Sequence, residues 1–222
     1  MRDEIRLLLP QNVEGEESLD LTQAGPLYSE EEAAVKHAVE KRRSEFRAGR
    51  DCARRALRHL GCENRALPAR SDRTVMWPEG VVGSITHTDD YAAAVVARIR
   101  HWPGLGIDAE SRYRASRELW PLIASEDEIE WFGAAGDPTL AIDRATLLFS
   151  AKESFYKAQY CITAKWVDFG EVRFRATLRG FEIELLTDLL GVGHRGRRFA
   201  GVFHEDAMRV VTLVALRASE LG

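Results

Sequence analysis

Residues 149–157 read FSAKESFYK and place one carboxylate and two ammonium groups among bulky apolar side chains. In a helix, Glu153 and Lys157 lie four positions apart and share a face, whereas Phe149, Phe155 and Tyr156 need burial. One interpretation is an exposed ion pair that contributes about 0.2–0.5 kcal/mol to helix stability. The other is a helix whose charged face belongs to a functional site.

A helix is expected to carry this stretch from about residue 139 to residue 160. Asp137 is a favourable N-cap, and Pro138 suits the first helical position because the ring fixes a helical φ angle. Shorter helices are expected at 116–123 and 125–131. The second of these begins with Ser125 and Glu128 in a capping-box pattern.

A second acidic group lies in residues 105–110, LGIDAE, which are expected to form a strand. Alternate strand residues point to one side, so Asp108 and Glu110 project together while Ile107 and Ala109 face the core. Two adjacent carboxylates repel each other and need a cation. An exposed acidic strand end and an Mg²⁺ site both fit this pattern, since Mg²⁺ prefers hard oxygen ligands. A zinc site is disfavoured because no second His or Cys stands at ligand spacing.

The N-terminal half contains a long basic helix in this interpretation. Residues 29–32, SEEE, form a capping box, and a helix is expected from there to Gly61, with a break or kink near Gly49. One face carries five arginines at spacings of three and four: Arg43, Arg47, Arg50, Arg54 and Arg58. This face is either a solvated surface or a cradle for phosphates, whose oxygens match guanidinium forks. A general nucleic-acid surface is disfavoured by the net charge of −4.

His87 lies in GSITHTDD, residues 83–90, just before the apolar run 91–97, which has the length of a buried strand. It is therefore expected at a turn between two strands. A structural role and a phosphate-binding role both remain open, the second because hydroxyls and a glycine surround the ring.

The order of elements predicts an α+β fold of two similar layers. A short strand is expected at 5–9, a loop at 11–25, and irregular chain at 62–80. Four further strands with glycines between them favour an antiparallel meander at 171–175, 180–186, 197–203 and 208–216. We expect an N-terminal half, 1–104, and a C-terminal half, 105–222.

Composition bounds the class of protein. The 222 residues contain 45% hydrophobic and 30% charged residues, as in ordinary globular chains. No apolar run approaches the roughly 20 residues that span a bilayer. The N-terminus does not resemble a secretory signal. Three cysteines without metal-like spacing suit a reducing compartment, so a cytoplasmic protein without membrane association is expected.

The motifs, taken in order, resemble those of the surfactin/enterobactin-type 4'-phosphopantetheinyl transferases. The resemblance covers roughly residues 29–176 and rests on KRRSEF (41–46) with RDCAR (50–54), WP (77–78), GSITH (83–87), GIDAE (106–110), FSAKESFYK (149–157) and KW (165–166). It implies a pseudo-twofold pair of halves, each with a long helix on a small, mostly antiparallel sheet. Coenzyme A and Mg²⁺, or Mn²⁺ in its place, are implied in the cleft between them.

The resemblance also implies roles for individual residues. It assigns metal binding to Asp108, Glu110 and Glu153, and pyrophosphate contacts to His87 and Lys157, with Thr86 beside them. It places Arg43 and Arg54 near the 3'-phosphate and adenine, and adds positive charge from Lys152. The family's Gly-x-Pro element before Trp77 is replaced here by RTVM, 73–76, which leaves the roles of Arg70 and Arg73 open.

The implied reaction is attack by a serine of an apo acyl- or peptidyl-carrier protein on the β-phosphate of coenzyme A, which releases adenosine 3',5'-bisphosphate. Glu153, Lys157 and His87 are the expected catalytic residues. Glu153 is the candidate base, directly or through a water held with Glu110. A monomer is expected, with no nucleic-acid partner. The alternative is a non-catalytic regulator of the same fold that binds coenzyme A or a carrier protein.

Overall fold

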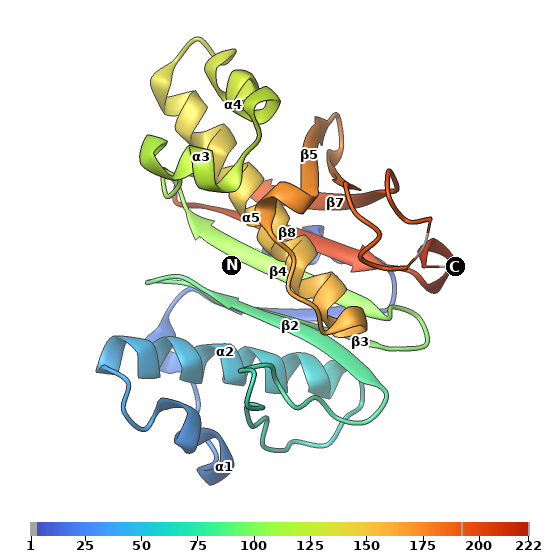
Figure 1. The fold of residues 1–222 in the computed structure, drawn as a ribbon. Coiled ribbons are helices and arrows are strands. Elements are labelled where there is room, and N and C mark those ends of the chain that lie inside the picture. Colours follow the sequence, from blue (N-terminus) through green and yellow to red (C-terminus); the bar gives the residue numbers. More distant parts are fainter. Residues whose placement is uncertain (1–3, 192, 222) are drawn as a thin grey trace.

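The computed structural model describes residues 4–191 and 193–221 and contains two antiparallel sheets, each covered by a long helix (Figure 1). The first sheet has the order β1-β3-β2 and comprises β1 (Val13–Ser18), β2 (Val81–His87) and β3 (Ala92–Arg98). The second has the order β4-β8-β7-β6-β5 and comprises β4 (Gly104–Ser111), β5 (Val172–Thr177), β6 (Gly180–Leu185), β7 (Arg198–Glu205) and β8 (Arg209–Leu216). The predicted α+β class and C-terminal meander are confirmed.

The helices differ greatly in length. They are α1 (Ser29–Glu32), α2 (Glu40–His59), α3 (Trp120–Ile123), α4 (Glu126–Gly133) and α5 (Pro138–Thr163). Helix α2 covers the first sheet and α5 the second, and α3 and α4 lie around the N-terminal part of α5 (Figure 1). None of the helices in the described residues combines the length and apolar character that crossing a bilayer requires.

The expected start of α5 is confirmed. The Asp137 carboxylate accepts hydrogen bonds from the N–H groups of Thr139 and Leu140, at 2.7 and 3.1 Å. The helix ends at Thr163 and is capped by Ala164, which adopts a left-handed φ of 49°. The capping box of α4 is also present, since Ser125 and Glu128 bond reciprocally.

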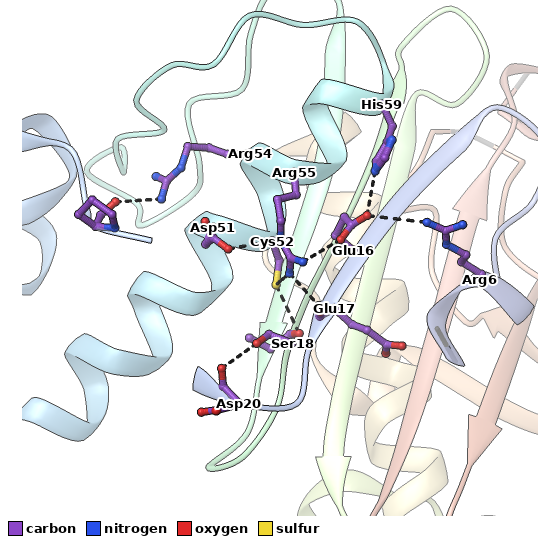
Figure 2. A network of polar contacts seen from close by, with 12 residues as sticks. Arg6, Glu16, Glu17, Ser18, Asp20, Asp51, Cys52, Arg54, Arg55 and His59 are labelled. Atoms are coloured by element: carbon purple, nitrogen blue, oxygen red, sulfur yellow. Dashed lines mark hydrogen bonds and ion pairs between the residues drawn. The ribbon is translucent and has the colours of Figure 1, made fainter. Parts of the chain in front are cut away.

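The N-terminal segment was predicted wrongly. The expected strand at 5–9 is a 3₁₀ helix, Glu4–Leu7, and the expected loop contains β1, which pairs with β3 from Val13↔Ala97 to Ser18↔Ala92. Strand β1 is acidic because it lies at the edge of its sheet, where its carboxylates meet cations. Figure 2 shows Glu16 between Arg6, Arg55 and His59, with its carboxylate 3.0 Å from Arg55 and 2.8 Å from His59.

The expected single helix over 29–61 is divided instead. After α1 and a 3₁₀ turn at Ala33–Val35 the chain bends, and α2 begins only after Val39. The N-cap is Tyr28 rather than Ser29, and its N–H donates to the Glu31 carboxylate. Glu31 is fully buried and also accepts from Arg54 on α2, at 2.8 Å. This ion pair folds α1 back against α2, so the two cannot form one continuous rod.

Strands β2 and β4 are the facing edges of the two sheets and lie side by side (Figure 1). Two buried hydroxyls on β2 join them. Ser84 Oγ accepts from the Ile107 N–H at 3.1 Å, and Thr86 Oγ1 accepts from the Ala109 N–H at 2.9 Å. The two bonds lie on either side of Asp108, so the joint between the halves positions this carboxylate.

We expect Thr86→Val to destabilise the chain by about 1–3 kcal/mol, because it leaves the buried Ala109 N–H without its acceptor while the side-chain shape is kept. Urea unfolding measures the loss. The control is Thr177→Val at an exposed position on β5, which should change stability by less than about 0.5 kcal/mol. Equal effects at the two positions would contradict this role of Thr86.

Helix α5 lies unusually close to β4, and glycine permits this. A Cβ placed on Gly106 would lie 1.9 Å from the carbonyl oxygen of Ser154, and one on Gly104 would lie 2.6 Å from that of Ala158. Both contacts are to helix backbone, which cannot turn aside as a side chain can. The two glycines thus set the short distance between β4 and the charged face of α5.

Gly49 of α2 permits a similar close approach to the first sheet, since a Cβ there would lie 2.7 Å from Ile85 of β2. Helix α2 passes through Gly49 without the break considered there.

Candidate functional site

The site forms where α5 crosses β4. The Lys157 ammonium donates to Asp108 Oδ1 at 2.7 Å and to the Ile107 carbonyl oxygen at 3.0 Å. Asp108 is buried and Lys157 is partly exposed. The structure therefore brings the predicted acidic strand and the stretch 149–157 together, as the sequence analysis expected.

The electrostatics around Asp108 favour an additional cation. Asp108 Oδ2 is buried and has no hydrogen-bond partner among the described residues. Burial, together with the negative charge of Asp108, raises the pKa of Glu110 to about 7. The same two causes raise the pKa of Glu153. Glu110 forms a long ion pair with Arg114, whose Nε lies 3.9 Å from its carboxylate. Three carboxylates thus share too little positive charge.

The three carboxylates have the ligand chemistry that a hard divalent ion needs. Oxygen donors are the ligands that Mg²⁺ prefers, and the partnerless Oδ2 of Asp108 is one such donor. No three His, Cys, Asp or Glu side chains within residues 4–191 and 193–221 already converge closely enough to hold an ion. Asp108, Glu110 and Glu153 are therefore neighbouring carboxylates rather than a closed coordination shell.

Glu110 should make the metal-free protein less stable as the pH rises. Its folded-state pKa of about 7 exceeds its usual value, so the folded chain keeps a proton that the unfolded chain releases. The unfolding free energy therefore falls as the pH rises from the ordinary pKa of 4.5 to the folded-state pKa of about 7. Glu110→Gln should stabilise the protein at about pH 8 and have much less effect at about pH 5, in urea unfolding with EDTA present.

The matched control is Glu130→Gln on the exposed face of α4. Its effect on the unfolding free energy should be the same at both pH values. A Glu110→Gln effect that is likewise independent of pH would contradict the raised pKa.

A cavity of about 720 Å³ opens beside Lys157, between the two halves of the chain. Its walls come from α2, the irregular segment 70–80, β2 and the C-terminal half of α5. Five cationic side chains line it: Arg42, Arg50, Arg70, Arg73 and Lys157. A cavity with this lining suits a ligand that carries several phosphates.

Arg70 and Arg73 belong to a small hairpin at one side of the cavity. The hairpin is closed by the bridge between Ala69 and Val75, and Arg73 at its turn has a φ of 70°. Asp72 at the tip accepts a hydrogen bond from Tyr160 of α5 at 3.2 Å. The segment that departs from the family motif therefore reaches across to the other half and presents two arginines.

The two arginines that the resemblance placed near the 3'-phosphate and adenine make contacts within the chain and do not line this cavity. Arg54 is buried and donates to both oxygens of Glu31, at 2.9 and 2.8 Å, and to the Pro26 carbonyl oxygen. Arg43 donates to the Val35 carbonyl oxygen and does not line the cavity. Arg50 does line it, with its Nε held by the Leu67 carbonyl oxygen at 2.8 Å.

Lys152, which was expected to add positive charge to the site, is enclosed by the chain. Its side chain is 1% exposed, and its ammonium donates to Glu128, Ile123 O and Phe169 O, at 2.9, 2.9 and 3.1 Å. It anchors α5 to α3, α4 and the chain before β5, and it does not line the cavity. An enclosed ammonium with three partners has no donor left for coenzyme A.

His87 was expected at the turn between two strands but is the last residue of β2, paired with Ala92 of β3, and it lines the cavity. Burial, with the positive charges of Arg42 and Lys157, lowers the pKa of His87 to about 4. Thr86 is buried, and its hydroxyl is used in the joint to β4.

Some residues of the site were not predicted. Arg42 and Glu45 lie in KRRSEF but off the arginine stripe, and Tyr156 and Tyr160 add aromatic walls. Tyr156 also packs on the exposed Trp166, with ring centroids 5.0 Å apart. Helical spacing alone could not separate Arg42 from a solvated arginine, because spacing does not say which face of α2 meets the cavity. That face carries Arg42, Phe46 and Arg50.

Comparisons with known proteins identify the family of this chain. Residues 30–97 match the 4'-phosphopantetheinyl transferase N-terminal domain, and residues 104–190 match the 4'-phosphopantetheinyl transferase superfamily. The chain is 38% identical over 180 residues to 4'-phosphopantetheinyl transferase Npt of Nocardia iowensis, which covers 81% of this chain and 78% of that protein.

Two further relatives have similar identities. Svp of Streptomyces mobaraensis, another 4'-phosphopantetheinyl transferase, is 39% identical over 199 residues, covering 86% of this chain and 79% of that one. Enterobactin synthase component D of Salmonella typhimurium is 39% identical over 198 residues, covering 82% and 75% respectively. This chain belongs to the 4'-phosphopantetheinyl transferase superfamily.

Proposed function

We propose that this transferase moves the 4'-phosphopantetheine group of coenzyme A onto a serine hydroxyl of an apo acyl- or peptidyl-carrier protein and releases adenosine 3',5'-bisphosphate. The observation that carries the proposal is the arginine-lined cavity whose wall includes Lys157, because the Lys157 ammonium is bonded to Asp108, one of three neighbouring carboxylates. A polyphosphate ligand in the cavity would bring its reactive phosphate next to these acids.

In this proposal the chain's own residues position the phosphates. Arg50, Arg70 and Arg73 bind the phosphates of coenzyme A in the cavity, while Lys157 neutralises charge on the pyrophosphate. Such a displacement depends mainly on orientation and charge stabilisation. Lys157 is suited to this because Asp108 and the Ile107 carbonyl oxygen fix its ammonium.

Asp108, Glu110 and Glu153 are the residues that would hold Mg²⁺, or Mn²⁺. The bound ion would supply Lewis-acid neutralisation of phosphate oxygens. Glu153 is our candidate base for the serine proton, directly or through a water held with Glu110. In the metal-free protein, burial and the negative charge of Asp108 raise the pKa of Glu153.

We further propose that residues 1–104 supply the arginine wall and that residues 105–222 supply the acids and Lys157. The first sheet is built only from strands before residue 99, and the second only from strands after residue 103. Residues of both halves line the cavity, and we propose that the protein is a monomer. All three cysteines are free, which supports a cytoplasmic location.

The partner class follows from the relatives. One of them is named as a component of enterobactin synthase, and we propose carrier proteins of siderophore, nonribosomal-peptide or polyketide assembly as partners. We propose no nucleic-acid partner. The positive charges of the cavity belong to an enclosed site rather than to a broad surface.

The test is to incubate the protein with coenzyme A, Mg²⁺ and a panel of apo-carrier proteins from these pathways and from fatty-acid synthesis. Intact-mass analysis should show one phosphopantetheine added to the carrier. A carrier with its serine replaced by alanine, and a reaction with EDTA, are the controls. Binding of coenzyme A without transfer to any carrier would instead support a non-catalytic regulator.

A further inference from the structure

The hairpin 69–75 supplies Arg70 and Arg73 to the wall of the cavity. Its turn is closed by two backbone hydrogen bonds, from the Arg70 N–H to the Thr74 carbonyl oxygen at 2.8 Å and from the Arg73 N–H to the Arg70 carbonyl oxygen at 2.9 Å. Arg73 has a left-handed φ of 70°, which glycine adopts freely and an arginine adopts only at a cost. Such a conformation persists where surrounding contacts hold it. The positions of both arginines therefore depend on contacts that hold this turn.

These contacts converge on Asp72, at the tip of the hairpin. One carboxylate oxygen, Oδ1, accepts from the N–H and the hydroxyl of Thr74, at 3.0 and 2.6 Å. The other, Oδ2, accepts from the Tyr160 hydroxyl at 3.2 Å. Hydrogen bonds from Thr74 lower the pKa of Asp72, so its carboxylate is ionised at neutral pH. Asp72 thus stabilises the turn and also joins it to α5, which belongs to the opposite half of the chain.

Tyr160 is held in place on its own side of the cavity. Its ring packs on that of Tyr156, with centroids 5.6 Å apart, and Tyr156 packs in turn on Trp166. Tyr160 lies three residues after Lys157 on α5, and the close approach at Gly106 fixes this helix on β4. The Tyr160 hydroxyl is therefore a fixed point to which the hairpin can bind.

The negative charge of Asp72 is otherwise unfavourable in its surroundings. Asp72 is exposed and lines a cavity whose cations suit phosphates, so its carboxylate repels an anionic ligand. The turn itself does not require this charge, because an asparagine side chain makes the same hydrogen bonds to a backbone two residues on. An ionised acceptor does, however, form the stronger hydrogen bond with the Tyr160 hydroxyl. The bond to α5 thus accounts for an acid at this wall.

We propose that the hydrogen bond between Tyr160 and Asp72 is a latch that fastens the hairpin 69–75 to α5 and so holds Arg70 and Arg73 against the phosphates of bound coenzyme A. The ligand in this inference rests on the proposed function. Tyr160 and Asp72 are positioning residues, since they act through the two arginines. The latch governs how tightly coenzyme A is held rather than the chemical step, whose proposed groups lie on β4 and one turn or more earlier on α5.

Hydrogen exchange tests the latch in the full chain without coenzyme A. The N–H groups of Arg70, Arg73 and Thr74 are hydrogen-bonded, so their exchange with deuterium reports opening of the hairpin. Tyr160→Phe keeps the ring and removes the hydroxyl, and these groups should then exchange about 3- to 10-fold faster, the range of one hydrogen bond. Tyr113→Phe, at an exposed tyrosine after β4, is the matched control and should not change their exchange. Unchanged exchange in Tyr160→Phe would overturn the latch.

Calorimetry and steady-state kinetics test the effect on the ligand. Tyr160→Phe should weaken binding of coenzyme A about 3- to 10-fold and raise its KM, while kcat at saturating coenzyme A stays within about twofold. Asp72→Ala should also weaken binding, although it removes a negative charge from the cavity. Asp72→Asn keeps groups that can bond to Thr74 and Tyr160, and it should bind coenzyme A more tightly than Asp72→Ala does.

The combined variant separates a latch from a direct ligand contact. In the Asp72→Ala background, Tyr160→Phe should cause less than about a twofold further loss of affinity, because both residues act through one bond. Losses that multiply would make Tyr160 a ligand contact and overturn the proposal, as would tighter binding by Asp72→Ala. Failure of the natural chain to bind coenzyme A would reject the proposed function and the ligand assigned here, whereas hydrogen exchange would still decide whether the bond holds the hairpin.

Discussion

Gly106→Ala is expected to displace α5 from β4 and to remove most of the transferase activity. The added Cβ would lie 1.9 Å from the Ser154 carbonyl oxygen and 2.6 Å from the Ala158 N–H nitrogen. Because both atoms belong to helix backbone, relief requires a movement of the helix itself. Overpacking of this kind costs about 1–3 kcal/mol and occasionally more, and we expect the upper end or beyond.

The functional loss should exceed the loss of stability. The Lys157 ammonium lies 2.7 Å from Asp108 only while α5 keeps its close distance to β4. A small shift of α5 away from β4 would separate the ammonium from the acids. Urea unfolding and the carrier-loading assay measure the two effects. Gly133→Ala is the control, since a Cβ there meets nothing within 4 Å. A Gly106→Ala protein with normal stability and turnover would contradict the close approach.

Glu153→Gln and Asp108→Asn are each expected to lower the specificity constant for transfer by about 10²–10³, the loss typical of one preorganised electrostatic contact. Both changes keep the side-chain shape and remove one negative charge. In Asp108→Asn the loss has a second cause, because Lys157 loses its ion-pair partner. Initial rates of carrier loading with saturating Mg²⁺ provide the measurement.

The control for these variants is Glu130→Gln on the exposed face of α4, which should retain full activity. Binding of coenzyme A without divalent ion should change little in Glu153→Gln, since the proposed phosphate contacts remain. Near-normal transfer by either purified, folded variant would remove that residue from the proposed site.

Local signals predicted the C-terminal half well. Asp137 and Pro138 gave the start of α5, and alternation in residues 105–110 gave β4 with Asp108 directed away from the core residues Ile107 and Ala109. These features depend on capping and on strand periodicity, which act over a few residues. The contact of Lys157 with Asp108 could be anticipated only by relating two distant motifs.

Longer-range contacts explain what the sequence did not predict. Strand β1 is polar because its carboxylates meet Arg55 and His59 of α2, a partnership that strand propensity does not encode. The division of the basic helix depends on Glu31 of α1. Its carboxylate can be buried only because Arg54 of α2 neutralises the charge. The same pair withdraws Arg54 from the cavity. An arginine stripe therefore cannot by itself distinguish ligand-binding guanidinium groups from those that hold the fold.

The joint between the sheets makes unequal demands on the two strands that form it. Strand β2 must supply hydroxyl side chains at Ser84 and Thr86, whereas β4 supplies only the backbone N–H groups of Ile107 and Ala109. Every amino acid except proline carries that donor. The two hydrogen bonds therefore constrain the side chains of β2 and not those of β4. A substitution on β2 can remove a bond directly, whereas one on β4 can do so only by moving the backbone.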